Sequence, residues 1–269
     1  MSISENFLYF KFNLRFAPYT DLTKGRQDMD YQNVFKRYEL KYLLDERQRQ
    51  DLLDRMDGRM KIDGFGHTVI RNIYYDTDSY RLIRNSLDKP VYKEKLRVRS
   101  YRQVTADDDV FVEIKKKYES VVYKRRTALP EKEAVMWLAG GKIPGDSQIE
   151  KEIGYFRDFY GGLKPKVFLS YEREAFYPLD GSDTRITLDS NVLARRSGLS
   201  LRDGIYGVPV IGSGTSILEV KVSAAIPAWL IAFLREEEIQ KASFSKYGRY
   251  YEEYIAGNET GMKERLKYA

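Results

Sequence analysis

The sequence contains no cysteine and only one histidine, His67, in 269 residues. Without cysteine the chain has no disulfide framework, no thiolate nucleophile and no zinc–cysteine site, which fits a reducing compartment such as the cytoplasm. A single histidine excludes His-rich metal sites and argues against a Ser-His-Asp triad. His67 follows the polar, glycine-rich run Asp63–Gly66, so we expect it to lie in a loop.

Long apolar runs are also missing. No stretch approaches the roughly 20 apolar residues that a transmembrane helix needs, so we expect no membrane segment within the chain. The first residues show no basic segment followed by an apolar core, the arrangement typical of a secretory signal. The sequence therefore predicts a cytoplasmic protein.

The composition is that of a folded protein with a bias toward anionic partners. Hydrophobic residues make up 42% and aromatic residues 14% of the chain, which excludes a disordered protein, and 269 residues can bury a sizeable core. We expect an N-terminal extension over residues 1–28, a compact domain over 29–255 and a polar tail over 256–269. The net charge of +6 favours polyanionic partners.

The most informative stretch is Lys93–Arg102, in which charged and apolar residues alternate. Lys93, Lys95, Arg97 and Arg99 fall on one face of a strand, and Leu96 and Val98 on the other. Alternating patterns recur in other segments, which predicts about eight strands. The others cover Phe35–Leu44, Val69–Thr77, Phe111–Ser120, Val121–Leu129, Val167–Tyr177, Arg185–Val192 and Ile217–Val222.

Amphipathic segments between these strands predict helices that could cover the apolar faces. They span Glu46–Asp57 after an N-cap at Asp45, Ser79–Asn85, Pro130–Ala139, Ser147–Tyr160 and Pro227–Ile239. The economical arrangement is an α+β fold, in which a closed, eight-stranded antiparallel barrel encloses the charges and helices pack on its outside. The positive charges of lysine and arginine side chains that line a lumen would repel one another when it is empty, so we expect the lumen to hold a polyanion.

Eight short motifs occur in an order that resembles the catalytic domain of the vacuolar transporter chaperone (VTC) family. They are RYELKY, IYYD, KLRVRSY, EIKKK, SYEREAF, RITLD, ILEVKV and SFSKY. That family belongs to the CYTH, or triphosphate tunnel metalloenzyme, superfamily. The resemblance implies a phosphotransferase, an ATP-dependent polyphosphate polymerase that uses Mn²⁺ or Mg²⁺. It also implies ATP and polyphosphate or triphosphate as ligands, and leaves room for a separate membrane-protein partner.

The resemblance also implies roles for individual residues. The catalytic contacts to phosphate would be made by Lys41, Arg97, Arg99 and Lys246. Glu219 would bind the metal ion, with Glu39 as a second ligand. Arg126 is added because it lies in phase with Lys124. The remaining substrate-binding residues would be Lys115, Lys124, Arg126, Arg173, Arg185, Lys221 and Ser245.

Two departures from the expected motifs keep other functions open. Many tunnel triphosphatases begin with Glu-x-Glu-x-Lys, but the first position here is Arg37, which favours a polymerase over a hydrolase of inorganic or organic triphosphate. Ser243 stands where polymerase relatives often carry lysine. A non-catalytic module that binds polyphosphate or nucleotide therefore remains an alternative. Nucleic acid is not an expected partner, because the cations alternate with carboxylates on the same faces.

Structural roles remain open for several of these residues. Arg97 and Arg99 could be solvated charges of an edge strand. Glu219 could pair with Lys221, and Ser245 and Lys246 could cap a helix.

Overall fold

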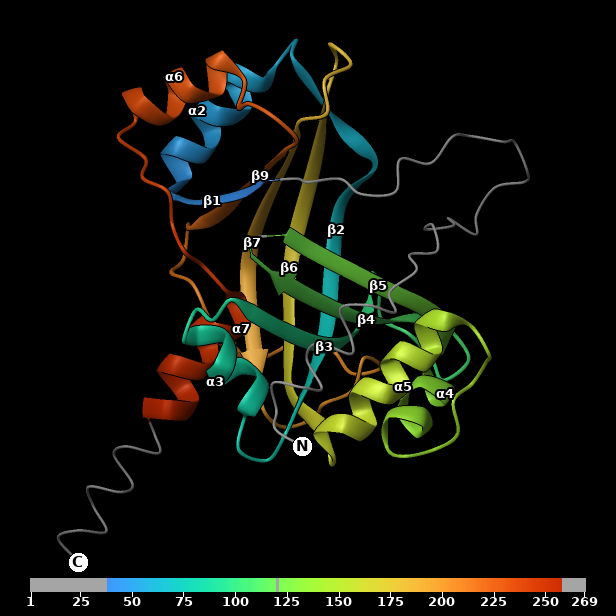
Figure 1. Cartoon of the computed structure of the whole chain (residues 1–269). Coiled ribbons are helices and arrows are strands. Elements are labelled where there is room, and N and C mark those ends of the chain that lie inside the picture. Colours follow the sequence, from blue (N-terminus) through green and yellow to red (C-terminus); the bar gives the residue numbers. More distant parts are fainter. Residues whose placement is uncertain (1–37, 120, 258–269) are drawn as a thin grey trace, which may run out of the picture. The chain divides into compact units, whose positions relative to one another are not determined.

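The computed structural model describes residues 38–119 and 121–257. The expected extension over residues 1–28, Arg37 and the tail from residue 258 onward lie outside these residues. One antiparallel sheet forms the centre of the described part (Figure 1). Its strands are β1 (Tyr38–Leu44), β2 (Met60–Asp76), β3 (Tyr92–Ser100), β4 (Asp109–Tyr118), β5 (Val121–Pro130), β6 (Lys164–Pro178), β7 (Arg185–Arg195), β8 (Val208–Pro209) and β9 (Ser216–Val222).

The sheet is open, so the expected closed barrel was wrong. Hydrogen-bonded neighbours follow the order β1-β9-β7-β6-β2-β3-β4-β5, and the two-residue β8 adds a ninth strand beside β7. Within the described residues no backbone pairing joins β1 to β5. Alternation of residue types fixes which face each side chain takes. It does not fix the separation of the first and last strands, so it could not decide closure.

The helices begin where the sequence supplies caps. Helix α2 (Glu46–Met56) starts after Asp45, whose side chain accepts from the backbone of Gln48 in a capping box. Helix α5 (Gln148–Tyr160) uses Ser147 and Glu150 in the same way. The other helices are α3 (Arg81–Leu87), α4 (Glu131–Leu138), α6 (Ala228–Glu236), α7 (Lys246–Tyr250) and the π-helix η1 (Tyr251–Ala256). No helix in the described ranges is long and apolar enough to cross a bilayer.

Two hydrophobic clusters bury the outer face of the sheet, as the alternation predicts. Helices α2 and α6 cover β1, β9 and β7 through residues such as Leu52, Leu218 and Phe233. Helices α4 and α5 cover β2 to β5 through residues such as Leu96, Val112 and Trp137. Because the apolar side chains are used on the outside, the charged side chains of the same strands are left on the inner face.

A third cluster holds helices α3, α7 and η1 against the sheet. The fully buried carboxylate of Asp76 in β2 accepts hydrogen bonds from the backbone of Leu82 (2.8 Å) and Ile83 (3.0 Å) and from the hydroxyl of Tyr247 (3.1 Å). The Tyr247 ring also stacks on Tyr74, with centroids 4.8 Å apart. One carboxylate therefore fastens both α3 and α7 to the same strand.

Strand β2 is longer than expected and includes His67. The sequence predicted a strand over Val69–Thr77 only, but β2 begins at Met60. The glycine-rich run lies where the register with β6 shifts, between Ile62 and His67. Gly66 supplies the positive φ of 57° there. A bulge rather than a loop thus accommodates the glycines, and His67 lies 3.0 Å from Glu172.

Candidate functional site

The first part of the site is the β3–β5 cluster, which consists of Arg97, Arg99, Glu113 and Lys124. Glu113 is 1% exposed and lies 2.7 Å from Arg97 Nη2, 2.8 Å from Lys124 Nζ and 3.9 Å from Arg99 Nε. Burial alone would raise the pKa of Glu113, but the three cations hold it at about 2. Three cations thus share one carboxylate, which leaves excess positive charge on this side of the sheet.

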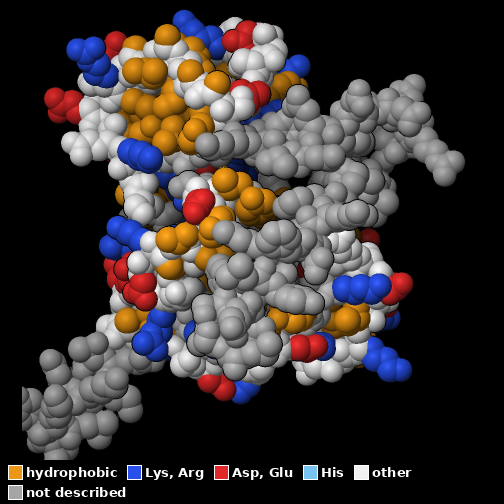
Figure 2. Space-filling view, in the orientation of Figure 1, with side chains coloured by type: hydrophobic (Ala, Val, Ile, Leu, Met, Phe, Trp, Pro, Cys, Tyr) orange, Lys and Arg blue, Asp and Glu red, His pale blue; other side chains and the backbone are white. Residues whose placement is uncertain are grey.

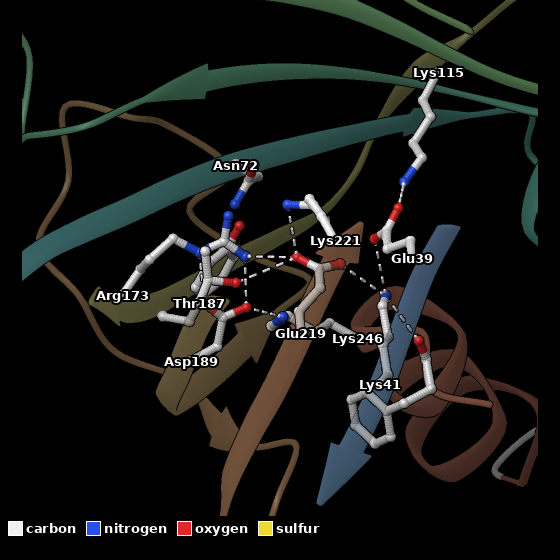
Figure 3. A network of polar contacts seen from close by, with 12 residues as sticks. Glu39, Lys41, Asn72, Lys115, Arg173, Thr187, Asp189, Glu219, Lys221 and Lys246 are labelled. Carbon is white, nitrogen blue, oxygen red and sulfur yellow. Dashed lines mark hydrogen bonds and ion pairs between the residues drawn. The ribbon is translucent and has the colours of Figure 1, made fainter. Parts of the chain in front are cut away.

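The second part is the β1–β9 cluster, which consists of Glu39, Lys41, Glu219 and Lys221 (Figure 3). Lys41 Nζ lies 3.7 Å from Glu39 and 3.5 Å from Glu219, and Lys221 Nζ lies 3.2 Å from the other oxygen of Glu219. Burial would raise the pKa of Glu219, yet Lys221, Lys41 and Arg173 hold it well below its usual value. The two carboxylates therefore lie side by side, with Lys41 between them.

A buried carboxylate, Asp189 of β7, connects two further cations to this cluster. Arg173 binds it in bidentate fashion, with distances of 2.5 and 2.7 Å, and Lys246 of α7 binds its second oxygen. Arg173 also reaches Glu219 at 3.4 Å. Asp189 is fully buried. Burial opposes its ionisation, but Lys246 and Arg173 lower its pKa, so it remains a carboxylate between two cations.

Tyr171 of β6 links the two sides of the site. Its hydroxyl accepts from Arg99 Nη2 at 3.3 Å, and its ring lies 4.4 Å from Lys246 Nζ and 5.2 Å from the Arg173 guanidinium. Burial would raise the pKa of Tyr171, but Arg99 and Arg173 lower it to about 8. A second link crosses from β4 to β1, where Lys115 Nζ lies 3.3 Å from Glu39. Figure 3 shows Lys115 extending toward Glu39 from the opposite strand.

The segment at the start of α7 supplies three groups to the inner face. Lys41 Nζ donates to the carbonyl of Phe244 (3.1 Å), and Lys95 Nζ donates to the hydroxyl of Ser245 (3.0 Å). Ser245 is also the N-cap of α7, where its side chain accepts from the backbone of Gly248 (3.2 Å). Ser245 thus caps a helix and contacts a site lysine at the same time, and Lys246 follows it.

Most of the residues chosen from the sequence therefore meet on the inner face, and Arg185 lies apart from the contacts described above. Arg126 stands opposite Glu113 in the strand register, so it shares the inner face, and its guanidinium lies over the Phe111 ring at 4.7 Å. Arg185 is exposed at the start of β7, with its guanidinium 5.4 Å from the Tyr177 ring centroid.

Sequence reasoning missed several members of the site. Lys95, Glu113 and Asp189 lie on the charged faces that alternation predicts, as was already expected for Lys95, but they were given no role in the site. Tyr171, Asn72 and Thr187 carry no charge, and their contacts to Arg99 (3.0 Å from Asn72) and Glu219 (3.4 Å from Thr187) depend on the fold.

Like charges face each other directly across the strands of this site. Lys95 stands opposite Lys115, and Lys115 stands opposite Lys124. Such pairs are destabilising without a counter-ion. Burial, together with neighbouring cations, lowers the pKa of Lys95 to about 8, and burial lowers the pKa of Lys124 to about 8 as well. The Lys115 side chain remains 39% exposed. This part of the inner face is therefore arranged for a multiply charged anion.

The lowered lysine pKa values predict opposite effects of pH on ligand affinity and on stability. Between pH 7 and 9, Lys95 and Lys124 lose their charge, so affinity for tripolyphosphate should fall by about tenfold for each lysine. The ligand-free protein should become more stable between about pH 8 and 10.5, because the unfolded lysines then bind more protons than the folded ones. Calorimetric titrations and thermal melts across this range measure both trends.

Lys95→Arg provides the control for this prediction, because arginine keeps its charge throughout the range. The variant should show a flatter decline of affinity with pH. An identical decline in both proteins would contradict a role for Lys95 in the pH dependence.

The donor set for a metal ion is small but suitable. In residues 38–119 and 121–257, no group of three or more histidine, aspartate or glutamate side chains forms a metal cage. Glu39 and Glu219 are adjacent carboxylates that face the cationic array. Mg²⁺ is commonly held by one or two carboxylates together with substrate phosphates and water. The pair thus fits an ion that arrives with a phosphate ligand rather than one held by the protein alone.

Comparison with known proteins identifies the family. The VTC domain model matches residues 36–254, and the chain therefore belongs to the VTC domain family. No curated protein matches the sequence significantly.

Three solved structures share low similarity with the chain. A protein of Bacillus halodurans described as a "putative adenylate cyclase" has 16% identity and a TM-score of 0.47, over 77% of this chain and 92% of that one. One of Vibrio parahaemolyticus with the same description has 12% identity and a TM-score of 0.41, over 80% and 97%. A protein of Pyrococcus horikoshii has 16% identity and a TM-score of 0.41, over 84% and 99%.

Proposed function

We propose that this protein is an ATP-dependent polyphosphate polymerase, which transfers the γ-phosphoryl group of ATP onto the end of a polyphosphate chain. The observation that carries the proposal is the row of directly opposed cations, Lys95, Lys115 and Lys124, beside the Arg97–Arg99 pair on the inner face. A linear polyanion would neutralise all of them at once, and membership of the VTC domain family supports this ligand class.

The proposed reaction needs positioning and charge stabilisation more than a covalent protein nucleophile. A terminal oxygen of the polyphosphate attacks the γ-phosphorus of ATP, a new phosphoanhydride bond forms, and the bond to ADP breaks as ADP leaves. Arg97 and Arg99 would bind equatorial phosphate oxygens with their planar forks. Arg173 and Lys246 would face them from across Tyr171, so that charge on the transferred group is stabilised from both sides.

Glu39 and Glu219 would hold Mg²⁺ or Mn²⁺ in this proposal. The ion would neutralise phosphate charge where the two carboxylates meet the substrate. Lys41 lies between the same carboxylates, so it would keep them close together when no substrate is bound.

A triphosphatase is the second candidate, and the Glu39–Glu219 pair is the observation that favours it. Two adjacent carboxylates could hold metal for hydrolysis, although the glutamate of the hydrolase motif is replaced by Arg37 in the sequence. Nucleic acid fits less well. On the visible part of the face in Figure 2, lysine and arginine side chains are interspersed with aspartate and glutamate rather than gathered in one basic stripe.

One assay separates these functions. Purified full-length protein is incubated with ATP and Mn²⁺. Polyphosphate is then detected by gel electrophoresis, and free phosphate is measured in a phosphate-release assay. Long polyphosphate together with ADP is the expected result. Free phosphate without polymer would instead identify a hydrolase. Neither product, combined with a higher melting temperature in tripolyphosphate, would identify a binding module and overturn the proposal.

A further inference from the structure

Apart from the inner face of the sheet, a cationic cavity lies where β6 begins and β7 ends. It has a volume of about 730 Å³, within the range of small-molecule sites. Its walls come from the starts of β6 and α3, the end of β7, the loop that leads into β8, and helix α7. Three cations, Lys166, Arg195 and Arg196, and three tyrosines, Tyr80, Tyr206 and Tyr250, contribute to the lining, and no aspartate or glutamate is among the lining residues that the structure describes.

Lys166 is paired with Asp78 at 2.7 Å, but the positive charge of Arg195 at the back of the cavity is poorly neutralised. Arg195 is only 5% exposed, and its hydrogen bonds go to the backbone carbonyls of Ser197, Gly198 and Tyr206, at 2.9 to 3.1 Å. Asp203 influences Arg195 through space, without a hydrogen bond between them among the described contacts. The buried guanidinium of Arg195 therefore has neutral carbonyl partners, and no carboxylate hydrogen-bonds to it within the described residues.

A second buried guanidinium adds to the positive electrostatic potential at the back of the cavity. Arg71 of β2 is 8% exposed, and its Nε and Nη1 atoms have no hydrogen-bond partner among the described residues. Burial and the neighbouring charge of Arg195 both lower the pKa of Arg71. Two buried arginines close enough to repel each other, without a bound carboxylate, are costly unless an anion lies nearby.

Tyr206 adds a flat, half-exposed surface to this charged wall. The Arg195 guanidinium lies 4.0 Å from the Tyr206 ring centroid, while Tyr206 itself remains 50% exposed. Lys166 Nζ lies 5.2 Å from the Tyr80 ring, and Arg196 hydrogen-bonds to Tyr250. Exposed aromatic rings beside arginine provide stacking platforms for nucleobases, whereas a bare phosphate would need only the cations.

We propose that this cavity is a nucleoside-phosphate-binding site, separate from the inner face of the sheet. The phosphate group binds Arg196 in the field of Arg195 and Arg71, with Lys166, itself paired with Asp78, as a second cation, and the base stacks on Tyr206. The site lies outside the group of residues assigned to phosphoryl transfer, although Tyr250 belongs to the same helix as Lys246.

Calorimetry with AMP tests this proposal in the full-length protein. The protein is first saturated with tripolyphosphate, which occupies the inner face, and AMP is then titrated. We expect one AMP per chain, with inorganic phosphate and adenosine each binding at least tenfold more weakly. Arg196→Glu and Tyr206→Ala should each lower AMP affinity by about tenfold or more, while both variants keep the melting temperature of the parent protein.

Lys142→Glu is the matched control, because Lys142 is exposed and lies outside the cavity, yet its substitution changes the net charge as Arg196→Glu does. AMP affinity should be unchanged in this variant. Three results would overturn the proposal: no AMP binding, equal losses in Arg196→Glu and Lys142→Glu, or inorganic phosphate binding as tightly as AMP. AMP binding that occurs in the free protein but is lost after saturation with tripolyphosphate would also refute it, since AMP would then be using the inner face.

Discussion

Replacing Arg97 by alanine is expected to lower the rate of ATP turnover by about a hundredfold or more, with little loss of folded protein. Removing one preorganised donor to a developing charge typically costs a factor of about 10²–10³ in kcat, and arginine in phosphoryl transfer can contribute more. The fold should survive because the buried Glu113 keeps its partners Lys124 (2.8 Å) and Arg99 (3.9 Å). Steady-state kinetics and a thermal melt of the same preparation measure both effects.

Arg125→Ala is the control for this prediction, because Arg125 is also an arginine in this part of the sheet but lies on its outer face. Its guanidinium is 3.8 Å from Glu152 of helix α5. Turnover should remain within about twofold of the parent protein in this variant. If Arg97→Ala and Arg125→Ala lost turnover equally, or if Arg97→Ala unfolded, the role given to Arg97 would be wrong.

Asp189→Asn should be the most damaging change to stability in the site. Asparagine keeps the shape of aspartate but removes the charge, so Arg173 and Lys246 would lose the carboxylate they share. Breaking a buried ion pair in this way typically costs about 3–5 kcal/mol. Chemical denaturation without ligand should show a loss of this size. Tripolyphosphate should then raise the melting temperature more in Asp189→Asn than in the parent protein, because the anion replaces the missing charge.

Asp78→Asn offers a comparison on the surface. Asp78 is also bound by two cations, Lys164 (2.8 Å) and Lys166 (2.7 Å), but its side chain is 68% exposed. Solvent screens such pairs, so this variant should unfold almost as the parent does and gain nothing special from tripolyphosphate. Similar destabilisation by the two substitutions would show that burial of Asp189 is not what makes its charge important.

Alternation along the strands was enough to predict much of this architecture. The inward direction of Arg97, Lys115 and Lys221, and the apolar outer face under the helices, follow from a period of two. The N-cap at Asp45 was also predictable, because its chemistry is local. The sequence pattern therefore indicates which side chains share a face whenever the strand itself is correctly placed.

Other features depend on how distant strands are arranged. Tyr171 has no charge and looks like an ordinary aromatic core residue, yet it contacts cations from β3 and α7. Arg185 has the right alternation but lies at the end of its strand, beyond the main contacts. Local patterns do not report the position along a strand at which several segments converge, so these residues could not be ranked from the sequence.

The ion pair between β1 and β4 has a consequence for the space in front of the inner face of the sheet. Lys115 of β4, the strand next to the edge strand β5, and Glu39 of the edge strand β1 meet through an ion pair at 3.3 Å, and within the described residues no backbone pairing joins β1 to β5. An ion pair with a 39% exposed lysine is weakened by salt, and an entering anion competes directly for that lysine. A polyanion that bound Lys115 would therefore displace Glu39, and no strand pairing within the described residues would have to break for the two strands to separate.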